Sequence, residues 1–234
     1  MESWPNRSLR TLLSSVPGPT ASYGYHSSVL GSLQEALRTL QKLNIKLCRQ
    51  GEIERQAAID EGETFAVERC IYNGKTVAVK RVKMGEGGAS DGDARKLGRR
   101  LANLLLDLRI MHHTPLRGHP NILNLVGYGW SVVDLVPFVV VDYASLGNSR
   151  TYLRDNARRL TFRDKIIFIG DVAAGLTALH ECEIVHGDLK LDNVLIFHTW
   201  DRPSNAIAKI CDFGYSLIIS EYEPQRTRYT GTFL

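Results

Sequence analysis

The 234 residues are enough for one large domain or two small ones, and 44% of them are hydrophobic, which supplies a sizeable core. The net charge of +4 comes from scattered basic residues without the clustered stripe that nucleic-acid binding requires, and no stretch approaches the roughly 18 apolar residues of a membrane span. Four cysteines lie far apart without a Cys-x-x-Cys pair, and the first residues lack a signal-peptide pattern. We therefore expect an intracellular, cytoplasmic protein, with a nuclear location left open, that binds neither nucleic acid nor membrane.

The first part of the chain is predicted to hold a flexible leader and one helix. Residues 1–28 are rich in Ser, Pro and Gly and predict the leader. Residues 29–54 predict an amphipathic N-terminal helix, because leucines recur three or four residues apart from Leu30 to Leu47 and Gly51 can end the helix. Two interpretations of this apolar face stay open: it packs on its own domain, or it binds a partner.

The remaining pattern predicts an α+β protein. Strands are expected at 64–72 and 76–82, joined by Asn73-Gly74, a pair that favours the tight turn of a hairpin. A flexible loop at 85–93 follows. A helix is expected at 94–112, where Leu97, Leu101, Leu104, Leu105, Leu108 and Met111 would lie on one side, and strands are expected at 122–132 and 137–143. Helices are expected at 151–156 and 162–180, and short apolar runs at 184–185, 193–197 and 207–211. The order is thus strands around one helix, then helices with short β segments.

Three short motifs carry most of the chemical information. Asp188-Leu189-Lys190 is followed by Asn193, and Asp212-Phe213-Gly214 begins 24 residues after Asp188. Upstream, Val77-Ala78-Val79-Lys80 lies on the second strand of the hairpin. Each motif alone occurs in many proteins, but the three in this order, each on its expected element, indicate one active site.

These residue types suit phosphoryl transfer, which depends on positioning and on neutralising phosphate charge. Asn193 and Asp212 offer the hard oxygen ligands that magnesium prefers. Lys80 offers a positive charge to the α- and β-phosphates, and Lys190 offers one to the γ-phosphate. Asp188 would orient the incoming hydroxyl group and accept its proton.

On these motifs, residues 55–234 resemble the eukaryotic protein kinase superfamily, and Lys190 after Asp188-Leu189 is similar to its Ser/Thr branch. The resemblance implies a bilobal fold, with a β-rich N-lobe around one main helix at 55–143 and a partial, helical C-lobe at 144–234. It implies Mg-ATP-dependent transfer of phosphate to Ser or Thr of a protein substrate, with ATP and Mg²⁺ as cofactors.

The resemblance also implies roles for individual residues. The nucleotide contacts are Gly62, Val67, Ala78, Lys80, Asp142, Ala144 and Leu195, with Tyr143 in the hinge and Val141 as gatekeeper. The catalytic group comprises Asp188, Lys190, Lys80 and its helix partner Asp107, and the metal ligands are Asn193 and Asp212. Met111, Leu125, His186 and Phe213 form the hydrophobic spine that links the lobes.

The sequence departs from the family pattern in its glycine-rich loop. Aligned on Val67, the loop falls at 60–67, and only its middle glycine, Gly62, is present. Asp60 and Phe65 stand where the first and third glycines are expected. Because glycines let the backbone approach the phosphates, this bulk and negative charge are expected to weaken ATP binding.

Two further departures concern the catalytic machinery. Asp107 stands where the family uses Glu; it is one methylene shorter, so a pair with Lys80 needs a closer helix or a water bridge, and an exposed helix acid is the alternative. Gly187 stands where Arg is common in the family, so phosphorylation of the activation loop is expected to act less on Asp188. Loop phosphosites and ordinary polar residues are both open for Thr227, Tyr229 and Thr230.

The end of the chain bears on partners and on activity. Gly231-Thr232 resembles the start of the substrate-facing segment, and no Ala-Pro-Glu element follows, so we expect an incomplete C-lobe whose apolar surface a partner completes or covers. Three hypotheses follow: a Ser/Thr kinase, a pseudokinase or nucleotide-binding interaction module, and an interaction fragment that acts through the helix at 29–49. Cys211, next to Asp212, is either a reactive thiol beside the nucleotide or an inert buried one.

Overall fold

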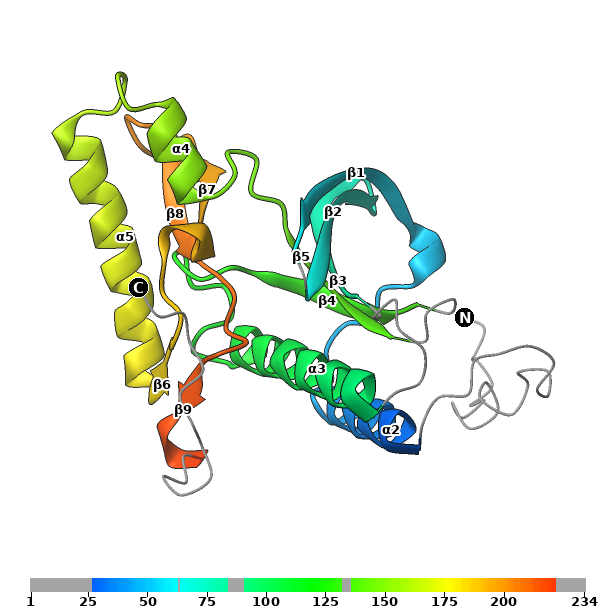
Figure 1. Cartoon of the computed structure of the whole chain (residues 1–234). Coiled ribbons are helices and arrows are strands. Elements are labelled where there is room, and N and C mark those ends of the chain that lie inside the picture. The colour runs from blue at the N-terminus through cyan, green and yellow to red at the C-terminus, as the bar shows by residue number, and fades with distance from the viewer. Residues whose placement is uncertain (1–26, 63, 84–90, 132–135, 222–234) are drawn as a thin grey trace, which may run out of the picture.

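The computed structural model describes residues 27–62, 64–83, 91–131 and 136–221. Most of the predicted leader and of the predicted loop at 85–93 lies outside the described residues, as do Thr227, Tyr229, Thr230 and Gly231-Thr232. The described residues form two lobes, one built on a twisted sheet and the other on two helices with short strands (Figure 1). This is the bilobal α+β arrangement that was predicted.

The first lobe is a five-stranded antiparallel sheet in the order β1-β2-β3-β5-β4. Its strands are β1 (Ile53–Glu61), β2 (Phe65–Tyr72), β3 (Lys75–Val82), β4 (Leu125–Trp130) and β5 (Pro137–Asp142). The predicted hairpin joins β2 to β3, and Asn73 and Gly74 have the positive φ values, 50° and 74°, that its turn requires. Its register pairs Val67 with Lys80, so both side chains lie on one face of the sheet.

Helix α3 (Asp91–His112) lies along that face, below the sheet in Figure 1. Its leucines, predicted as one apolar side, are buried at 97, 101, 104 and 108. The largest described cluster of buried apolar residues joins α3 to the sheet and also includes Leu179, Ile210 and Phe213 of the second lobe. The hydrophobic core therefore holds the two lobes together.

The helix predicted for residues 29–54 is too long. Helix α2 (Ser27–Lys42) ends where Asn44 takes a left-handed backbone conformation, with φ of 49°. The next residues extend along β4, with hydrogen bonds from Cys48 N–H to the Tyr128 carbonyl at 2.7 Å and from Tyr128 N–H to the Lys46 carbonyl at 3.0 Å. Leu47, counted in the predicted apolar stripe, is 56% exposed.

Strand β1 was missing from the predicted elements. It follows a short 3-10 helix, η1 (Gln50–Glu52), and most of its side chains are exposed. An edge strand with this burial has no apolar alternation, so its sequence carries little strand signal.

The second lobe contains α4 (Ser149–Asp155) and α5 (Phe162–Glu181) with four short strands. Strands β7 (Val194–His198) and β8 (Ala206–Ile210) pair with each other, and β6 (Ile184–Val185) pairs with β9 (Leu217–Ile218), which was not predicted. The 3-10 helix η2 (Leu191–Asn193) precedes β7, and η3 (Ile219–Glu221) follows β9. No helix among the described residues is long and apolar enough to cross a membrane.

Polar contacts fix α5 in this lobe. Thr161 and Asp164 form a reciprocal capping box at its first turn. Further along, the buried carboxylate of Asp171 binds the Arg202 guanidinium at 2.7 and 2.8 Å and accepts the Ala208 N–H at 2.9 Å. Helix α5 is thereby tied to β8, the strand that leads directly into Asp212.

Candidate active site

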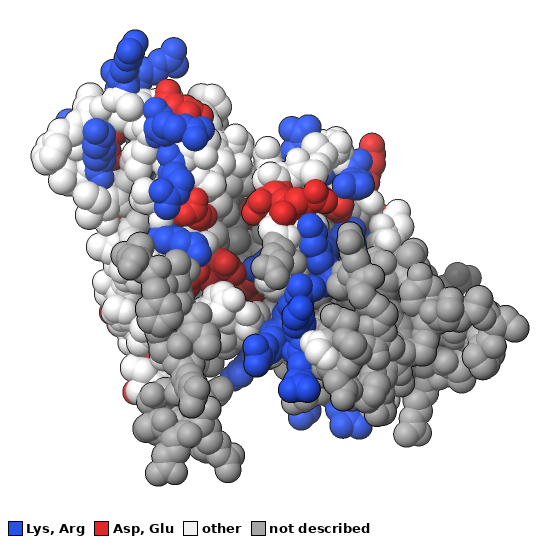
Figure 2. Space-filling view, in the orientation of Figure 1, with Lys and Arg blue, Asp and Glu red and all other residues white. Residues whose placement is uncertain are grey.

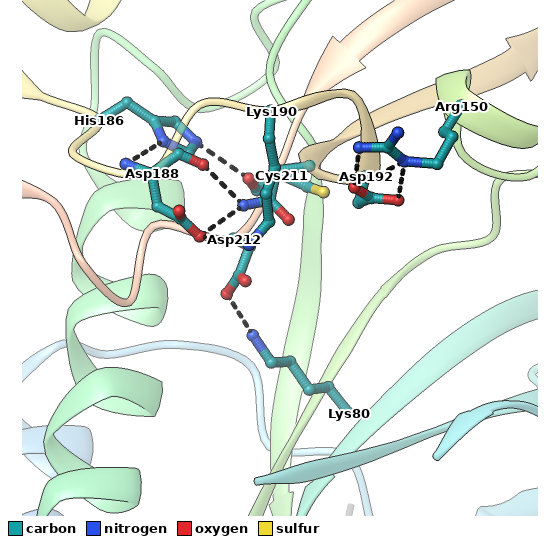
Figure 3. Close-up of polar contacts among 9 residues, drawn as sticks. Lys80, Arg150, His186, Asp188, Lys190, Asp192, Cys211 and Asp212 are labelled. Atoms are coloured by element: carbon teal, nitrogen blue, oxygen red, sulfur yellow. Dashed lines mark hydrogen bonds and ion pairs between the residues drawn. The ribbon is translucent and has the colours of Figure 1, made fainter. Parts of the chain in front are cut away.

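The site is built around Lys80 on β3, between the two lobes. Its ammonium group lies 2.7 Å from the Asp107 carboxylate of α3 and 2.8 Å from the Asp212 carboxylate, which follows β8 (Figure 3 shows the second contact). Burial works to lower the pKa of Lys80, but the two carboxylates outweigh it and hold that pKa above its ordinary value. The lysine is therefore positively charged at neutral pH.

Asp107 is buried, at 3% exposure, so the alternative of an exposed helix acid is wrong. One carboxylate oxygen accepts from Lys80, and the other accepts from the backbone N–H of Phe213. The short side chain reaches Lys80 directly, which favours a closer helix over a water bridge. Asp107 thus links α3, β3 and the Asp212-Phe213-Gly214 motif.

Phe65 also contacts Lys80. The Lys80 ammonium lies 4.4 Å from the centre of the Phe65 ring, a cation–π distance. Phe65 is the residue at the expected third glycine, and it is the first residue of β2. Gly62, the one expected glycine present, is exposed between β1 and β2. The ring therefore occupies space next to the lysine that a glycine would leave open.

The second group of polar residues belongs to the loop between β6 and β7. Asp188 is buried at 6% exposure, and its carboxylate accepts from Lys190 Nζ at 2.9 Å and Asn193 Nδ2 at 3.1 Å. Asn193 Nδ2 also donates to the Asp188 carbonyl at 2.8 Å. These contacts hold the three side chains together on one compact loop, on which Figure 3 shows Asp188 and Lys190.

A backbone hydrogen bond joins this loop to the Asp212 segment. The Cys211 N–H donates to the Asn193 carbonyl at 2.9 Å, which sets Asp212 beside the loop (Figure 3). The surface between the two lobes is hollowed here, with acidic and basic side chains along it (Figure 2). Lys80, Asp107 and Asp212 are thus brought together with Asp188, Lys190 and Asn193.

His186 anchors the loop from within the core. Asp188 N–H donates to His186 Nδ1 at 3.3 Å, so the neutral ring carries its proton on Nε2 and donates to the Cys211 carbonyl at 3.0 Å. Burial holds the pKa of His186 below its ordinary value, which favours this neutral form. The ring packs on Phe213 with centroids 5.4 Å apart, and Phe213 belongs to the same buried cluster as Met111.

Two residues at the site have left-handed backbone conformations. Asp212 has φ of 64° and Gly187 has φ of 77°. A Cβ atom at Gly187 would overlap the carbonyl oxygen of Tyr215. Glycine is therefore required there by the path of the chain, which explains why the family's Arg is not found at this position.

The predicted adenine contacts come from both lobes. Ala78 and Val141 are neighbours on β3 and β5, and Val67 and Leu195 pack against the same apolar cluster from β2 and β7. Asp142 ends β5, where its N–H bonds to the Asn124 carbonyl, and Ala144 follows in the connection between the lobes. The four apolar side chains thus belong to one cluster to which both lobes contribute.

Two contacts at the site were not predicted from the sequence. Arg150 on α4 binds both carboxylate oxygens of Asp192, within 2.9–3.0 Å, and so ties α4 to the catalytic loop (Figure 3). The two residues are 42 positions apart, and no local pattern indicates their pairing. The second contact is that of Phe65 with Lys80, which spacing alone also does not reveal.

Comparison with known proteins agrees with this geometry. The family model for protein tyrosine and serine/threonine kinases matches residues 53–233. The chain therefore belongs to the protein kinase family, an enzyme family.

Individual relatives are named as probable or putative kinases of Dictyostelium discoideum and Arabidopsis thaliana. The chain is 33% identical over 178 residues to the probable serine/threonine-protein kinase gdt2 of Dictyostelium discoideum, a match of 75% of this chain and 10% of that protein. It is 36% identical over 116 residues to the probable serine/threonine-protein kinase gdt8 of the same organism, covering 49% of this chain and 9% of gdt8. A putative L-type lectin-domain containing receptor kinase, V.8, of Arabidopsis thaliana is 36% identical over 121 residues, covering 49% of this chain and 18% of its own length. The matched region is thus a small part of each of these relatives.

Proposed function

We propose that this chain binds Mg-ATP and transfers the γ-phosphate to a Ser or Thr hydroxyl of a protein substrate. One observation carries the proposal: the charged Lys80 lies within 2.8 Å of Asp212, directly beside the loop that holds Asp188, Lys190 and Asn193. Phosphoryl transfer requires this convergence of cations and carboxylates around one point.

In the proposed complex, the nucleotide lies between the lobes. Val67 and Ala78 cover the adenine from above and Leu195 supports it from below, while backbone groups of Asp142 and Ala144 bond its edge. Lys80 binds the α- and β-phosphates, oriented by Asp107. Gly62 is the one glycine at which the loop backbone can approach the phosphates closely.

The donor set fits magnesium bound together with a nucleotide. Among the described residues no group of three or more His, Cys, Asp or Glu could hold a metal ion by itself. Mg²⁺ commonly takes one or two protein oxygen ligands and completes its shell with phosphate oxygens and water. Asn193 and Asp212 would supply those protein ligands, and the bound ion would neutralise charge on the phosphates.

Asp188 and Lys190 act on the transferred group and its acceptor. The buried Asp188 carboxylate would orient the substrate hydroxyl and accept its proton. Lys190 now binds this carboxylate at 2.9 Å, and its ammonium group would offset the γ-phosphate charge. Ser or Thr is proposed as the acceptor because of Lys190 and because gdt8 and gdt2 are named as probable serine/threonine-protein kinases.

The test has two stages on the full chain. Isothermal titration measures binding of ATP with magnesium, and radiolabel transfer to a generic protein substrate measures turnover, with Asp188→Asn as the matched variant. The proposal expects binding by both proteins and transfer by the wild type only. Absence of ATP binding, or transfer that survives in Asp188→Asn, would contradict it.

A second function, a nucleotide-binding module without turnover, is favoured by one contact. The Phe65 ring beside Lys80 fills space where the family has glycine, and an incoming phosphate must share that space. Binding of Mg-ATP without transfer would select this function. Replacement Phe65→Gly would then strengthen ATP binding without restoring transfer.

We also propose that a partner protein packs on the exposed apolar side of α5. Phe162, Ile166 and Ile169 are 79%, 49% and 63% exposed, and their spacing of four and three residues puts them on one side of the helix. Apolar patches of this kind mark contact surfaces. Light scattering of the wild type and of Ile169→Glu tests this, with less association expected for the variant.

We propose that the protein works in the cytoplasm.

A further inference from the structure

Residues 27–49 lie before the region that the kinase family model matches, yet they are packed into the first lobe. Leu33, Ala36 and Leu40 are buried at 6%, 0% and 1% exposure, three and four residues apart along α2. Leu33 and Leu40 belong to the same core cluster as the leucines of α3. This answers the open question about the predicted helix: its apolar face packs on its own domain.

The same segment has a second anchor on β4. Residues 46–48 run parallel to the strand at Tyr128, and Cys48 is only 1% exposed. A Cβ atom at Gly127 would overlap the Lys46 carbonyl oxygen, and one at Gly129 would overlap the Cys48 carbonyl oxygen. Both glycines therefore provide the close approach that this segment requires.

Helix α3 lies between α2 and the sheet (Figure 1). It carries Asp107, whose side chain must reach Lys80 with one methylene fewer than the Glu of the family. The 2.7 Å contact thus depends on how closely α3 approaches β3. The segment that packs on α3 is in a position to set that distance.

We propose that residues 27–49 are a positioning element of the nucleotide site. By packing α2 on α3 and pairing residues 46–48 with β4, they hold α3 where Asp107 reaches Lys80. Leu40 and Ala36 are the positioning residues, acting through α3 and without contact to the nucleotide. The inference rests on the proposed nucleotide site but concerns a segment outside the family match.

The test separates the phosphate part of the site from its adenine part. Leu40→Ala and Ala36→Gln disturb the α2–α3 contact, Leu40→Met keeps its volume, and Arg38→Ala changes an exposed residue of the same helix. Titration with Mg-ATP and with adenosine gives two affinities for each folded protein, as checked by circular dichroism. We expect the first two variants to weaken ATP binding about tenfold, with adenosine binding changed less than about twofold. Leu40→Met and Arg38→Ala should match the wild type.

A double-mutant cycle ties the effect to Asp107. In an Asp107→Asn background, Leu40→Ala should lower ATP affinity no further, because the contact that it disturbs is already lost. An equal loss in both backgrounds, or parallel losses of ATP and adenosine binding, would overturn the positioning role. Stronger ATP binding by Leu40→Ala would also overturn it, because it would show that residues 27–49 oppose ATP binding.

A measurement without nucleotide tests the positioning role of residues 27–49 independently of the proposed ATP binding. Acetylation of Lys80, followed by mass spectrometry relative to the exposed Lys75, reports the Asp107 contact even if the wild type binds no ATP. We expect Lys80 to react several times faster in Leu40→Ala and Ala36→Gln than in the wild type or Arg38→Ala, since its ammonium group loses the 2.7 Å contact with Asp107 and becomes accessible to the reagent. Equal rates in all four proteins would refute the inference.

Discussion

Replacement of Asp107 by Asn tests the central ion pair without changing the shape of the side chain. The Asp107 and Lys80 side chains are 5% and 18% exposed, so solvent screens their attraction little. Removing one partner of a buried pair typically costs about 3–5 kcal/mol. Lys80 keeps Asp212, whose side chain is 36% exposed, so we expect the lower end of this range, about 3 kcal/mol, in the free energy of unfolding.

The comparison with Asp107→Ala isolates the second contact of the carboxylate. Asn can still accept the backbone N–H of Phe213 through its side-chain oxygen, whereas Ala leaves this buried donor without a partner. A buried unpaired N–H costs about 1–3 kcal/mol, so Asp107→Ala should be less stable than Asp107→Asn by that amount.

Urea unfolding followed by circular dichroism measures these differences. Asp192→Asn is the matched control, because it removes a carboxylate that also binds a cation but at an exposed site. We expect a much smaller loss of stability for the control. If Asp107→Asn were as stable as the control, the buried pair would not hold α3 to the sheet, and the reasoning would be refuted.

Three further predictions follow from single residues. The pKa of His186 lies below its ordinary value of 6.5, so as pH falls the unfolded chain takes up a proton before the folded protein does, and the free energy of unfolding should drop below about pH 6.5 with a slope of at most about 1.4 kcal/mol per pH unit. In urea unfolding, His186→Gln should lose this part of the slope. An unchanged slope would contradict the assignment. Gly187→Arg, which introduces the residue common in the family, should destabilise the protein by about 1–3 kcal/mol, because position 187 has a φ of 77° and the Tyr215 carbonyl leaves no room for a side chain. A melting temperature equal to that of the wild type would argue against this. Burial raises the pKa of the Cys211 thiol, so native iodoacetamide labelling should leave it unmodified while the less buried Cys182 reacts, and early labelling of Cys211 would show that it is accessible.

The elements that the sequence predicted well are those with a local signal. The Asn73-Gly74 turn and the leucine stripe of α3 could each be predicted from residues close together in the sequence, and α3 begins only three residues before the predicted start. Strand β1 and the extended residues 46–48 depend instead on pairing with distant strands. Their side chains are mixed in burial, so tertiary contacts and not periodicity decide their conformation.

The candidate site shows the same division. The order of the motifs predicted that Lys80, Asp188 and Asp212 belong to one site, because each motif lies at a fixed place in a known kind of fold. The sequence alone could not show whether the Asp107 side chain would reach Lys80, since that depends on the distance between α3 and β3. It also could not show that Phe65 would turn its ring toward Lys80.

The departures from the family pattern are accommodated by specific contacts in this structure. Asp107 is shorter than Glu, yet it reaches Lys80 at 2.7 Å, on a helix that α2 covers from the other side. Gly187 replaces a common Arg at a position where the Tyr215 carbonyl leaves no room for a Cβ atom. Phe65 replaces a glycine and contacts the Lys80 ammonium through its ring. Of the three departures, only Phe65 occupies space that a phosphate needs, so the choice between kinase and nucleotide-binding module depends mainly on whether this ring moves when ATP binds.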